Sequence, residues 1–496
     1  MPSSSKLLDF TDRKPLSFAA RPVNGFRDSP RLTCLRRGRG ELIAVKLVLL
    51  IGGLIFVDVT VGQVGEEWIS HYDGTGHCDD RPKAMALDAQ GNILVAGDSY
   101  GAKMDYAVVK YDSFGNRLWV ARYNGPSGGV DELNSMVLDD EGNVYVTGGS
   151  VGDESGYPSF DIATLKYDAA GNKVWEQRHQ WSDPTQPPQQ DDDLGSDKGT
   201  SLAIDSTGHL YVTGSVATAR NESDVVLLKY APGGELEWAA YHDGAGHRQD
   251  IGNAVVVDAS DNVYVAGKSY YDQYHGDPIL LKYSADGQLE WMRHHPGDAA
   301  TAMVLDPAGF LVLMVESGFP GDFITIKYDL EGRLLWASSY DGAGGHDVPH
   351  DMTVDRMGNV LVCGRTEHPD SRIDFLTLKY SPDGILLWET RYAGWGQSYD
   401  SANAIAVDRA GDVYVTGYTG SLPDFLTIKY DSHGRQLWTA RHNGPANGRD
   451  HARLIVVLSR RRFFVAGSVQ DNPHGDCVDF ATIRYTELPT KTTRHK

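Results

Sequence analysis

Cysteine is scarce in this chain, which has four cysteines among 496 residues and no C-x-x-C pair. This excludes a disulfide-rich scaffold and the common zinc and thiol-redox motifs. The sequence also lacks an H-E-x-x-H motif, a phosphate-binding glycine loop and a compact D-x-D-x-D-G calcium loop. Zinc peptidases, P-loop enzymes and EF-hand proteins are therefore disfavoured.

Basic residues are in the minority, with 46 Lys and Arg against 67 Asp and Glu. Outside residues 1–64 the chain holds 36 basic and 62 acidic residues, a formal charge of −26. A body this acidic repels phosphate backbones, so we expect no nucleic-acid partner. The solubility of an exported protein is sufficient to explain the charge.

The apolar run Leu47–Val57 has eleven residues and follows a polar, arginine-rich stretch. A membrane helix needs about 20 residues, so this run resembles the apolar region of an export signal. The preceding stretch is long for such a signal, which leaves a downstream start codon, an uncleaved anchor or an unexported protein as alternatives. We predict an export signal or signal-anchor with a polar extension at 1–62, a folded domain at 63–486 and a short polar tail at 487–496. The expected location is secreted or cell-envelope, with membrane contact only through an uncleaved anchor.

From Trp68 to Tyr485 the chain consists of repeats. One element, K-Y-D-S-F-G-N-R-L-W, ends at Trp119 and recurs six times at spacings of 45 to 63 residues. A second element, A-L-D-A-Q-G-N-I-L-V-A-G at 86–97, occurs eight times in all. A period of about 50 residues with four short β segments is typical of propeller blades. We therefore predict an all-β fold, a single β-propeller of eight four-stranded blades, or seven if the weak copy at 304–315 is not a blade.

One unit illustrates the four expected strands. They are predicted at Ala404–Val407, Asp412–Gly417, Asp424–Tyr430 and Gln436–His442, with tight Asp- and Gly-containing turns between the first two and the last two. The last unit ends after its third strand at 479–485, whereas E-W-I-S-H-Y at 67–72 precedes the first unit. We expect this N-terminal strand to complete the last blade and close the ring.

Ring closure brings Cys78 and Cys477 to neighbouring strand ends. In an oxidising compartment a disulfide there would fix the closing seam; the alternative is two unpaired thiols in adjacent loops.

The repeats resemble the bacterial "seven-bladed β-propeller" (SBBP) repeat family through D-x-x-G-N-V-Y-V-T-G and D-F-x-T-x-K-Y-D-x-x-G-x-x-x-W. The resemblance covers about 420 residues and implies an exported or surface-associated propeller, usually without an assigned activity. The G-N-R-L-W element at 115–119 is also similar to the docking element of the eight-bladed quinoprotein dehydrogenases. The chain has no adjacent Cys–Cys pair and no recognisable quinone or calcium ligands, so we expect no cofactor and no metal site.

The connections between strands two and three, and between successive blades, vary in length and share one rim. We expect binding residues on this rim because variable loops on a rigid scaffold carry most recognition. The candidate ligand-binding residues are its aromatic side chains Trp181, Trp395, Tyr270, Tyr271, Tyr274 and Tyr399. The alternative is that these rings cover the rim or pack between loops.

Aspartates precede the first strand in six units. They are Asp80, Asp131, Asp250, Asp347, Asp400 and Asp450. These carboxylates could surround the channel mouth and hold a cation, or each could accept backbone N–H groups and fix its own loop. Three histidines, His77, His247 and His346, lie in the same loops.

Three functions remain open. The first is a binding or scaffold module, a monomer, whose partner is an extracellular carbohydrate or protein. The second is an extracellular hydrolase or lyase that uses carboxylates at the channel mouth. The third is a structural envelope protein without a small-molecule ligand.

Overall fold

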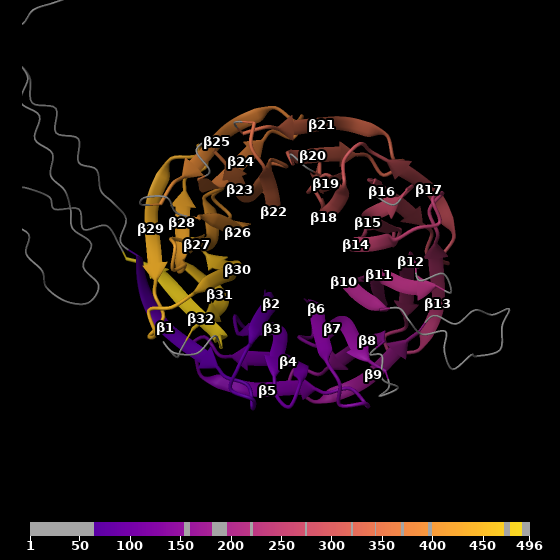
Figure 1. The fold of residues 1–496 in the computed structure, drawn as a ribbon, viewed down its shortest axis with the longest axis horizontal. Coiled ribbons are helices and arrows are strands. Elements are labelled where there is room, and N and C mark those ends of the chain that lie inside the picture. The colour runs from indigo at the N-terminus through magenta and orange to yellow at the C-terminus, as the bar shows by residue number, and fades with distance from the viewer. Residues whose placement is uncertain are drawn as a thin grey trace, which may run out of the picture. The chain divides into compact units, whose positions relative to one another are not determined.

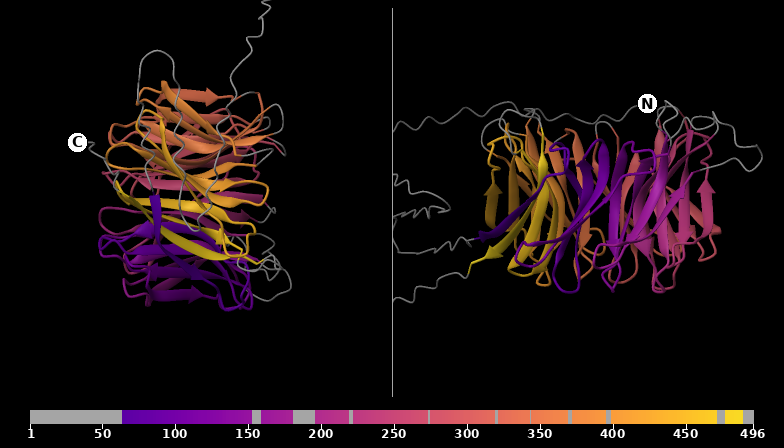
Figure 2. Two further views of the ribbon diagram at one scale, coloured as in Figure 1. Left: turned by 90° about the vertical axis from the view of Figure 1, so that its left-hand side faces the viewer. Right: turned by 90° about the horizontal axis from the view of Figure 1, so that it is seen from below.

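The computed structural model describes residues 64–152, 159–180, 196–218, 222–272, 275–318, 321–342, 344–368, 372–394, 399–470 and 477–488. Within these residues all regular structure is β, arranged as eight four-stranded antiparallel sheets. The sheets follow one another around a ring, seen down its axis in Figure 1 and from its sides in Figure 2. The predicted eight-bladed propeller is confirmed. The described part of the chain contains no helix able to span a membrane.

Each blade runs from an inner strand near the ring axis to an outer strand (Figure 1). Blades 1 and 2 comprise β2 (Arg81–Leu87), β3 (Ile93–Tyr100), β4 (Met104–Tyr111), β5 (Arg117–Tyr123), β6 (Asp131–Leu138), β7 (Val144–Val151), β8 (Phe160–Tyr167) and β9 (Lys173–His179). Blades 3 and 4 comprise β10 (Lys198–Ile204), β11 (Leu210–Thr218), β12 (Glu222–Tyr230), β13 (Leu236–His242), β14 (Asp250–Val257), β15 (Val263–Tyr270), β16 (Gly276–Tyr283) and β17 (Leu289–His294).

Blades 5 and 6 comprise β18 (Ala299–Leu305), β19 (Leu311–Glu316), β20 (Phe323–Tyr328), β21 (Leu334–Tyr340), β22 (Asp347–Val354), β23 (Val360–Glu367), β24 (Ile373–Tyr380) and β25 (Leu386–Tyr392). Blades 7 and 8 comprise β26 (Ser401–Val407), β27 (Val413–Thr419), β28 (Asp424–Tyr430), β29 (Gln436–His442), β30 (His451–Ser459), β31 (Arg462–Val469), β32 (Asp479–Glu487) and β1 (Val64–Tyr72). The weak copy at 304–315 thus belongs to a complete fifth blade, which excludes the seven-bladed alternative.

The ring closes in blade 8, where the first strand of the chain pairs with the last. Strands β1 and β32 are antiparallel, with Trp68 opposite Arg484. In Figure 1 the indigo β1 lies beside the yellow β32. The prediction that the N-terminal strand completes the last blade is confirmed, and both strands lose an exposed edge in this way.

All four predicted strands of blade 7 are present, but β27 begins one residue later and ends two residues later than predicted. Strands β28 and β29 have the predicted bounds, whereas β26 begins three residues earlier than predicted, at Ser401. The reason is a bulge at Asn403, where the register shifts between Ala402 and Ala404. The Asn403 side chain interrupts the apolar alternation and donates a hydrogen bond to the Ala452 carbonyl of blade 8 at 2.7 Å.

The recurring D-x-x-G-N motif forms the tight turn between the first and second strands. In blade 1, Asp88 Oδ1 accepts the backbone N–H groups of Gln90 and Asn92 at 3.0 and 2.8 Å. Gly91 takes a φ of 79°, a region that favours glycine. The carboxylate therefore replaces backbone partners in the turn and fixes its geometry.

The blade tryptophans connect neighbouring sheets. Trp119 of blade 1 lies against Gly171 in the turn between β8 and β9, and its indole N–H donates to the Ala169 carbonyl at 3.2 Å. A Cβ at Gly171 would lie 2.6 Å from the indole, so glycine is required there. Blade 8 lacks this turn because its outer strand is β1, and Trp438 of blade 7 instead stacks on Phe463 with ring centroids 5.4 Å apart.

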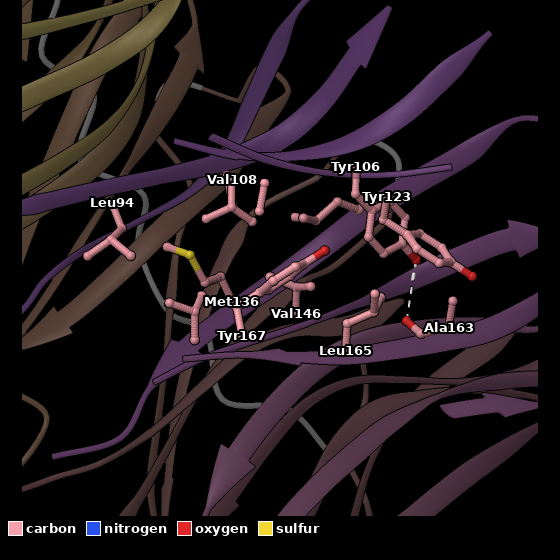
Figure 3. Close-up of a cluster of buried hydrophobic side chains, with 13 residues drawn as sticks. Leu94, Tyr106, Val108, Tyr123, Met136, Val146, Ala163, Leu165 and Tyr167 are labelled. Atoms are coloured by element: carbon pink, nitrogen blue, oxygen red, sulfur yellow. Dashed lines mark hydrogen bonds between the residues drawn. The ribbon is translucent and has the colours of Figure 1, made fainter. Parts of the chain in front are cut away.

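The core consists of apolar layers between adjacent blades. Figure 3 shows the layer between blades 1 and 2, where Leu94 and Val108 of blade 1 and Val146 and Leu165 of blade 2 belong to one buried cluster. Tyr106 reaches across this layer and donates to the Ala163 carbonyl at 3.4 Å. Because every blade packs on two neighbours in this way, the ring is a rigid frame for its loops.

Candidate functional site

The antiparallel order of each blade separates its connections into two rims. Tight turns join first to second and third to fourth strands on one rim, which we call the turn rim. The connections between second and third strands and between blades, which vary in length, lie on the opposite rim, which we call the variable rim. Of the residues predicted to bind a ligand, the described ones, Tyr270, Tyr271 and Tyr399, belong to the variable rim.

The six predicted channel-mouth carboxylates are fully buried, and each accepts a backbone N–H from its own loop. The aspartates are Asp80, Asp131, Asp250, Asp347, Asp400 and Asp450, and all are 0% exposed. Their Oδ2 atoms accept the N–H groups of Gly74, Gly125, Gly244, Gly342, Gly394 and Gly444 at 2.5 to 2.7 Å. These are the contacts of the loop-fixing alternative.

Burial acts on the titration of these aspartates. It raises the pKa of Asp80, Asp131, Asp250 and Asp347 above the ordinary value, and the hydrogen bonds that each carboxylate accepts oppose the rise. In Asp80 and Asp450 the second oxygen also accepts an N–H, from Tyr100 at 2.9 Å and from Gln470 at 3.0 Å. Both oxygens of these two carboxylates therefore hold the loop ends.

Two of the three loop histidines repeat one local structure. The Nδ1 atoms of His77 and His247 lie 2.6 Å from Oδ2 of Asp73 and Asp243, four residues earlier. Both histidines have positive φ angles, of 52° and 48°. The bond to Asp73 raises the pKa of His77. The third histidine, His346, immediately precedes Asp347.

The predicted aromatic residues are only partly within the described structure. Trp181, Trp395 and Tyr274 lie outside the described residues. Tyr271 and Tyr399 are 55% and 60% exposed. Tyr270 is half-buried, with the Lys268 ammonium 4.1 Å from its ring centroid. Among the predicted aromatics that are described, Tyr271 and Tyr399 therefore present the most ring surface to solvent.

A set of arginine–tyrosine contacts, which the motifs did not reveal, connects blades below the variable rim. Arg178 of blade 2 donates to the Tyr123 hydroxyl of blade 1 at 2.9 Å and to Asp161 of its own third strand at 2.7 Å. The other three arginine–tyrosine bonds, all of 2.8 Å, are Arg122 to Tyr72, Arg391 to Tyr340 and Arg441 to Tyr392.

At the four remaining junctions between blades, other residues occupy both the arginine and the tyrosine position. The arginine lies three residues after the tryptophan of its own blade, and the tyrosine lies four residues after the tryptophan of the preceding blade. Where the first position is not arginine, the second is histidine; the pairs are Tyr241 with His179, His294 with His242, Ser339 with His295, and His71 with His442. In the first of these the rings stack, with His179 Nε2 3.0 Å from the Tyr241 hydroxyl. Comparing successive repeats at these two positions would have revealed the pattern from sequence.

Two groups of three aspartates lie on the variable rim in blades without this arginine. One consists of Asp73, Asp80 and Asp479, and the other of Asp224, Asp243 and Asp250; within each group, carboxylate oxygens lie within 4.8 Å of one another. Burial and the neighbouring acidic groups Asp243 and Asp250 raise the pKa of Asp224 to about 7. Sequence analysis identified only Asp80 and Asp250 of these six residues.

Two segments match the nucleophile pattern G-x-S-x-G, at Gly97–Gly101 and Gly148–Gly152. Their serines, Ser99 and Ser150, are 0% exposed and lie within β3 and β7 rather than at a strand-to-helix turn. The hydroxyl of Ser150 accepts a hydrogen bond from Arg178 at 2.6 Å. The serine therefore accepts a bond from an arginine that also contacts the neighbouring blade, and both serines lack the exposure that a nucleophile elbow gives.

A groove of about 580 Å³ lies on the turn rim between blades 5 and 6. Its lining includes Phe310, Leu335 and Met357, of which Met357 is 78% exposed. The buried ion pair of Lys327 with Asp306, 2.7 Å long, also lines it. None of the predicted site residues borders this groove.

Comparison with known proteins identifies the fold. The beta-propeller repeat SBBP matches residues 390–423, which confirms the resemblance for that segment. No curated protein sequence matches the chain. The solved Dos1 propeller is 10% identical over 85% of this chain and 95% of its own, with a TM-score of 0.52.

Two enzymes are also similar in structure. The periplasmic gluconolactonase PpgL of Pseudomonas aeruginosa is 15% identical over 70% of this chain and 94% of its own, with a TM-score of 0.45. The polysaccharide lyase Uly1 is 10% identical over 84% of this chain and 90% of its own, with a TM-score of 0.42. At these identities the likeness concerns the fold alone.

Proposed function

We propose that this chain is an exported or cell-surface β-propeller that serves as a binding or scaffold module. Its ligand is an extracellular carbohydrate or protein, contacted by the loops of the variable rim. The observation that carries this proposal is a fixed and exposed aromatic ring on blade 4. Tyr271 stacks on His275, with ring centroids 6.0 Å apart and planes inclined by 12°, while 55% of the tyrosine stays exposed.

A ring held in this way loses little conformational entropy when a ligand covers it. Sugar rings and apolar side chains both bind aromatic faces, and tyrosine adds a hydroxyl that can donate a hydrogen bond. The preceding residue, Tyr270, is also held in place, because Lys268 lies over its ring and the Lys268 ammonium is 2.6 Å from Asp298. Tyr399, which is 60% exposed, offers a second ring at the entry to blade 7.

Export of the protein is supported by chemistry at the closing seam. Cys78 and Cys477 form a disulfide. Such bonds persist in oxidising compartments and are rare in a reducing cytosol. This fits the export signal or anchor predicted at residues 1–62, which lie outside the described residues.

The proposal is tested by binding of the purified protein to an array of extracellular polysaccharides and glycans, with and without Tyr271→Ala and Tyr399→Ala. We expect binding that each substitution weakens at least about tenfold, in line with the loss of one stacked aromatic contact. Phe114→Ala is the matched control, since Phe114 is 77% exposed in a tight turn of the opposite rim. Trp181→Ala and Trp395→Ala extend the test to the predicted loop tryptophans.

Two results would contradict the carbohydrate form of the proposal. One is the absence of binding by folded, monodisperse protein; the other is binding that Phe114→Ala weakens as much as Tyr271→Ala. In the first case the same variants would be tested against extracellular proteins captured from the native environment. A protein that is captured by the Phe114→Ala control but no longer by Tyr271→Ala would be identified as the partner.

A further inference from the structure

In every blade an aspartate lies in or, in blade 5, directly before the third strand, five residues before the Lys or Arg that precedes the final tyrosine. The eight aspartates are Asp105, Asp161, Asp224, Asp277, Asp322, Asp374, Asp424 and Asp479. In blades 1 and 2 this carboxylate pairs with the arginine of the fourth strand, in the pairs Asp105–Arg122 and Asp161–Arg178. The guanidinium balances the buried negative charge, as such a carboxylate requires.

Blade 3 lacks this counter-charge and carries an additional acidic residue. Tyr241 stands where the arginine would be, and its ring turns to His179 of blade 2. The fifth residue after the blade tryptophan is Asp243, whereas the four arginine blades have Asn124, Gln180, Ala393 and Asn443 there. Relative to an arginine blade, this corner has therefore lost one positive charge and gained one negative charge.

The geometry around Asp224 suits a metal ion. Its carboxylate and those of Asp243 and Asp250 offer oxygens within 4.8 Å of one another. Ca²⁺ binds oxygen at about 2.3–2.6 Å, so two of its ligands can be at most about 5 Å apart. Three protein carboxylates can thus contact one ion without movement of the backbone.

A buried acceptor without a donor points to a ligand at the same place. Asp250 is 0% exposed, and its Oδ2 accepts the Gly244 N–H at 2.5 Å. Its Oδ1 accepts no hydrogen bond within the described residues, although the Ser269 hydroxyl lies close enough to lower its pKa. A buried carboxylate oxygen without a partner is costly unless a cation or water contacts it.

Unpaired Oδ1 atoms also occur in Asp131 and Asp347, but without the triad of acids. The third-strand carboxylate next to Asp131 is Asp105, which is paired with Arg122 at 2.8 Å. The one next to Asp347 is Asp322, whose Oδ2 accepts the Ser339 hydroxyl at 3.1 Å. Blade 3 combines the buried acceptor with two further carboxylates.

No lysine or arginine of the described residues forms an ion pair with these three carboxylates. The nearest arginine in sequence, Arg248, pairs with Glu222 at 3.1 Å. His247 contacts Asp243 from the exposed side, at 2.6 Å, and the imidazole is 64% exposed.

We propose that Asp224, Asp243 and Asp250 bind a hard divalent cation of the Ca²⁺ type, which supplies the positive charge that blade 3 lacks without the arginine. The ion neutralises the triad and connects the third strand of blade 3, its exit loop and the first residue of β14. Water completes the coordination because Asp243 is exposed, and Ca²⁺ tolerates such irregular oxygen shells better than Mg²⁺.

The group of Asp73, Asp80 and Asp479 lacks a buried aspartate oxygen without a hydrogen-bond donor of the kind found in Asp250. Both oxygens of Asp80 accept backbone N–H groups, from Gly74 at 2.6 Å and Tyr100 at 2.9 Å. Its buried carboxylate is therefore satisfied without a metal ion. The inference is confined to blade 3.

The experiment is calorimetric titration of the full-length, chelator-treated protein with CaCl₂, and with MgCl₂ as a second probe. Wild-type protein should bind Ca²⁺ with a dissociation constant of about 0.1–1 mM, as extracellular calcium modules do, and should bind Mg²⁺ more weakly. Tyr241→Arg, which restores the guanidinium of the arginine blades, should abolish this binding. Asp243→Asn should weaken it at least about tenfold. Asp341→Asn, at the same loop position in blade 5, is the control and should leave binding unchanged.

Melting curves separate loss of the site from loss of the fold. Ca²⁺ should raise the melting temperature of wild type and of Asp341→Asn, but not that of Tyr241→Arg. Without Ca²⁺, Tyr241→Arg should melt at or above the wild-type temperature, which would show that it folds. Absence of saturable Ca²⁺ binding by wild type would overturn the proposal, and so would unchanged binding by a folded Tyr241→Arg protein.

Discussion

Cys78 and Cys477 are 399 residues apart in sequence and form a disulfide, with their Cα atoms 4.5 Å apart. The bond lies next to the closing blade, where Asp80 donates its backbone N–H to the Val478 carbonyl at 2.7 Å. The seam joins the two ends of the repeat region, because β1 must stay paired with β32 for the ring to remain closed. The disulfide therefore restrains the one sheet whose strands come from both ends of the propeller.

Replacing this disulfide should lower stability more than any single surface change. Cys78→Ser should lower the free energy of unfolding by about 2–5 kcal/mol, because the cross-link removes entropy from a very long unfolded loop. Cys477→Ser and the double variant should show the same loss, since all three lack the same bond. Urea denaturation with and without a reducing agent measures this. Two results would contradict a stabilising Cys78–Cys477 disulfide. One is a double variant whose stability still falls when the reducing agent is added; the other is a double variant that loses the sum of the two single losses.

Much of the fold was predictable because its determinants are local and repeated. The turn motif around Asp88 supplies its own hydrogen bonds, and β28, whose bounds match the prediction, is an apolar-rich strand that is almost entirely buried. Ring closure followed from simple counting, since a lone outer strand ending at Tyr72 must pair with a blade that stops at its third strand. The predicted bounds were wrong at β27, which extends to Thr419, and at the start of the inner strand β26, where the bulge at Asn403 breaks the alternation.

The candidate site was less predictable because it depends on contacts between blades. The sequence places Tyr123 and Arg178 55 residues apart, and only the ring brings the hydroxyl within 2.9 Å of the guanidinium. The triad of Asp224, Asp243 and Asp250 likewise combines a strand, a loop and the next blade. A motif search within one repeat cannot detect either arrangement, whereas comparing equivalent positions of successive repeats can.

The packing of Trp119 on Gly171 can be measured by adding one methyl group. Gly171 has a φ of 86°, and a Cβ there would lie 2.6 Å from the indole. Gly171→Ala should therefore lose about 1–3 kcal/mol through overpacking, besides the cost of alanine at positive φ. The measurement is the free energy of unfolding in urea.

Gly142→Ala is the matched control for that experiment. Gly142 has a φ of 81°, but the nearest atom to its Cβ would be the Ala169 methyl at 3.7 Å, an ordinary contact. Both variants share the backbone strain, so their difference isolates the tryptophan contact. Equal losses of stability would show that the indole gives way at no cost.

The arginine–tyrosine junctions should couple neighbouring blades energetically. Arg178→Met removes the bond to Tyr123 and leaves Asp161, which is 9% exposed, without its guanidinium. We expect a loss of about 3 kcal/mol, of which Asp161→Asn in the same chain should recover a large part. Arg333→Met is the control: Arg333 also pairs with an aspartate at 2.6 Å, but its side chain is 75% exposed, so little change is expected. Equal losses of stability in Arg178→Met and Arg333→Met would show that burial does not determine how much these ion pairs stabilise the fold.

His451 should make the propeller less stable as the pH falls. Burial, together with the positive charges of Arg453 and Arg449, lowers the pKa of His451 from 6.5 to about 4. The unfolded chain therefore binds a proton between pH 6.5 and 4 that the folded chain does not, so stability is fully present above pH 6.5 and decreases through this window. The loss should amount to roughly 1–3 kcal/mol, since partial exposure reduces the full linkage energy.

His451→Phe keeps the stacking on Tyr418, whose ring centroid is 4.5 Å away, and removes the titrating group. Urea unfolding at several pH values should show a flatter curve for His451→Phe than for wild type, while His433→Phe, in an exposed turn, should follow wild type. Parallel curves for wild type and His451→Phe would show that the proton binds elsewhere.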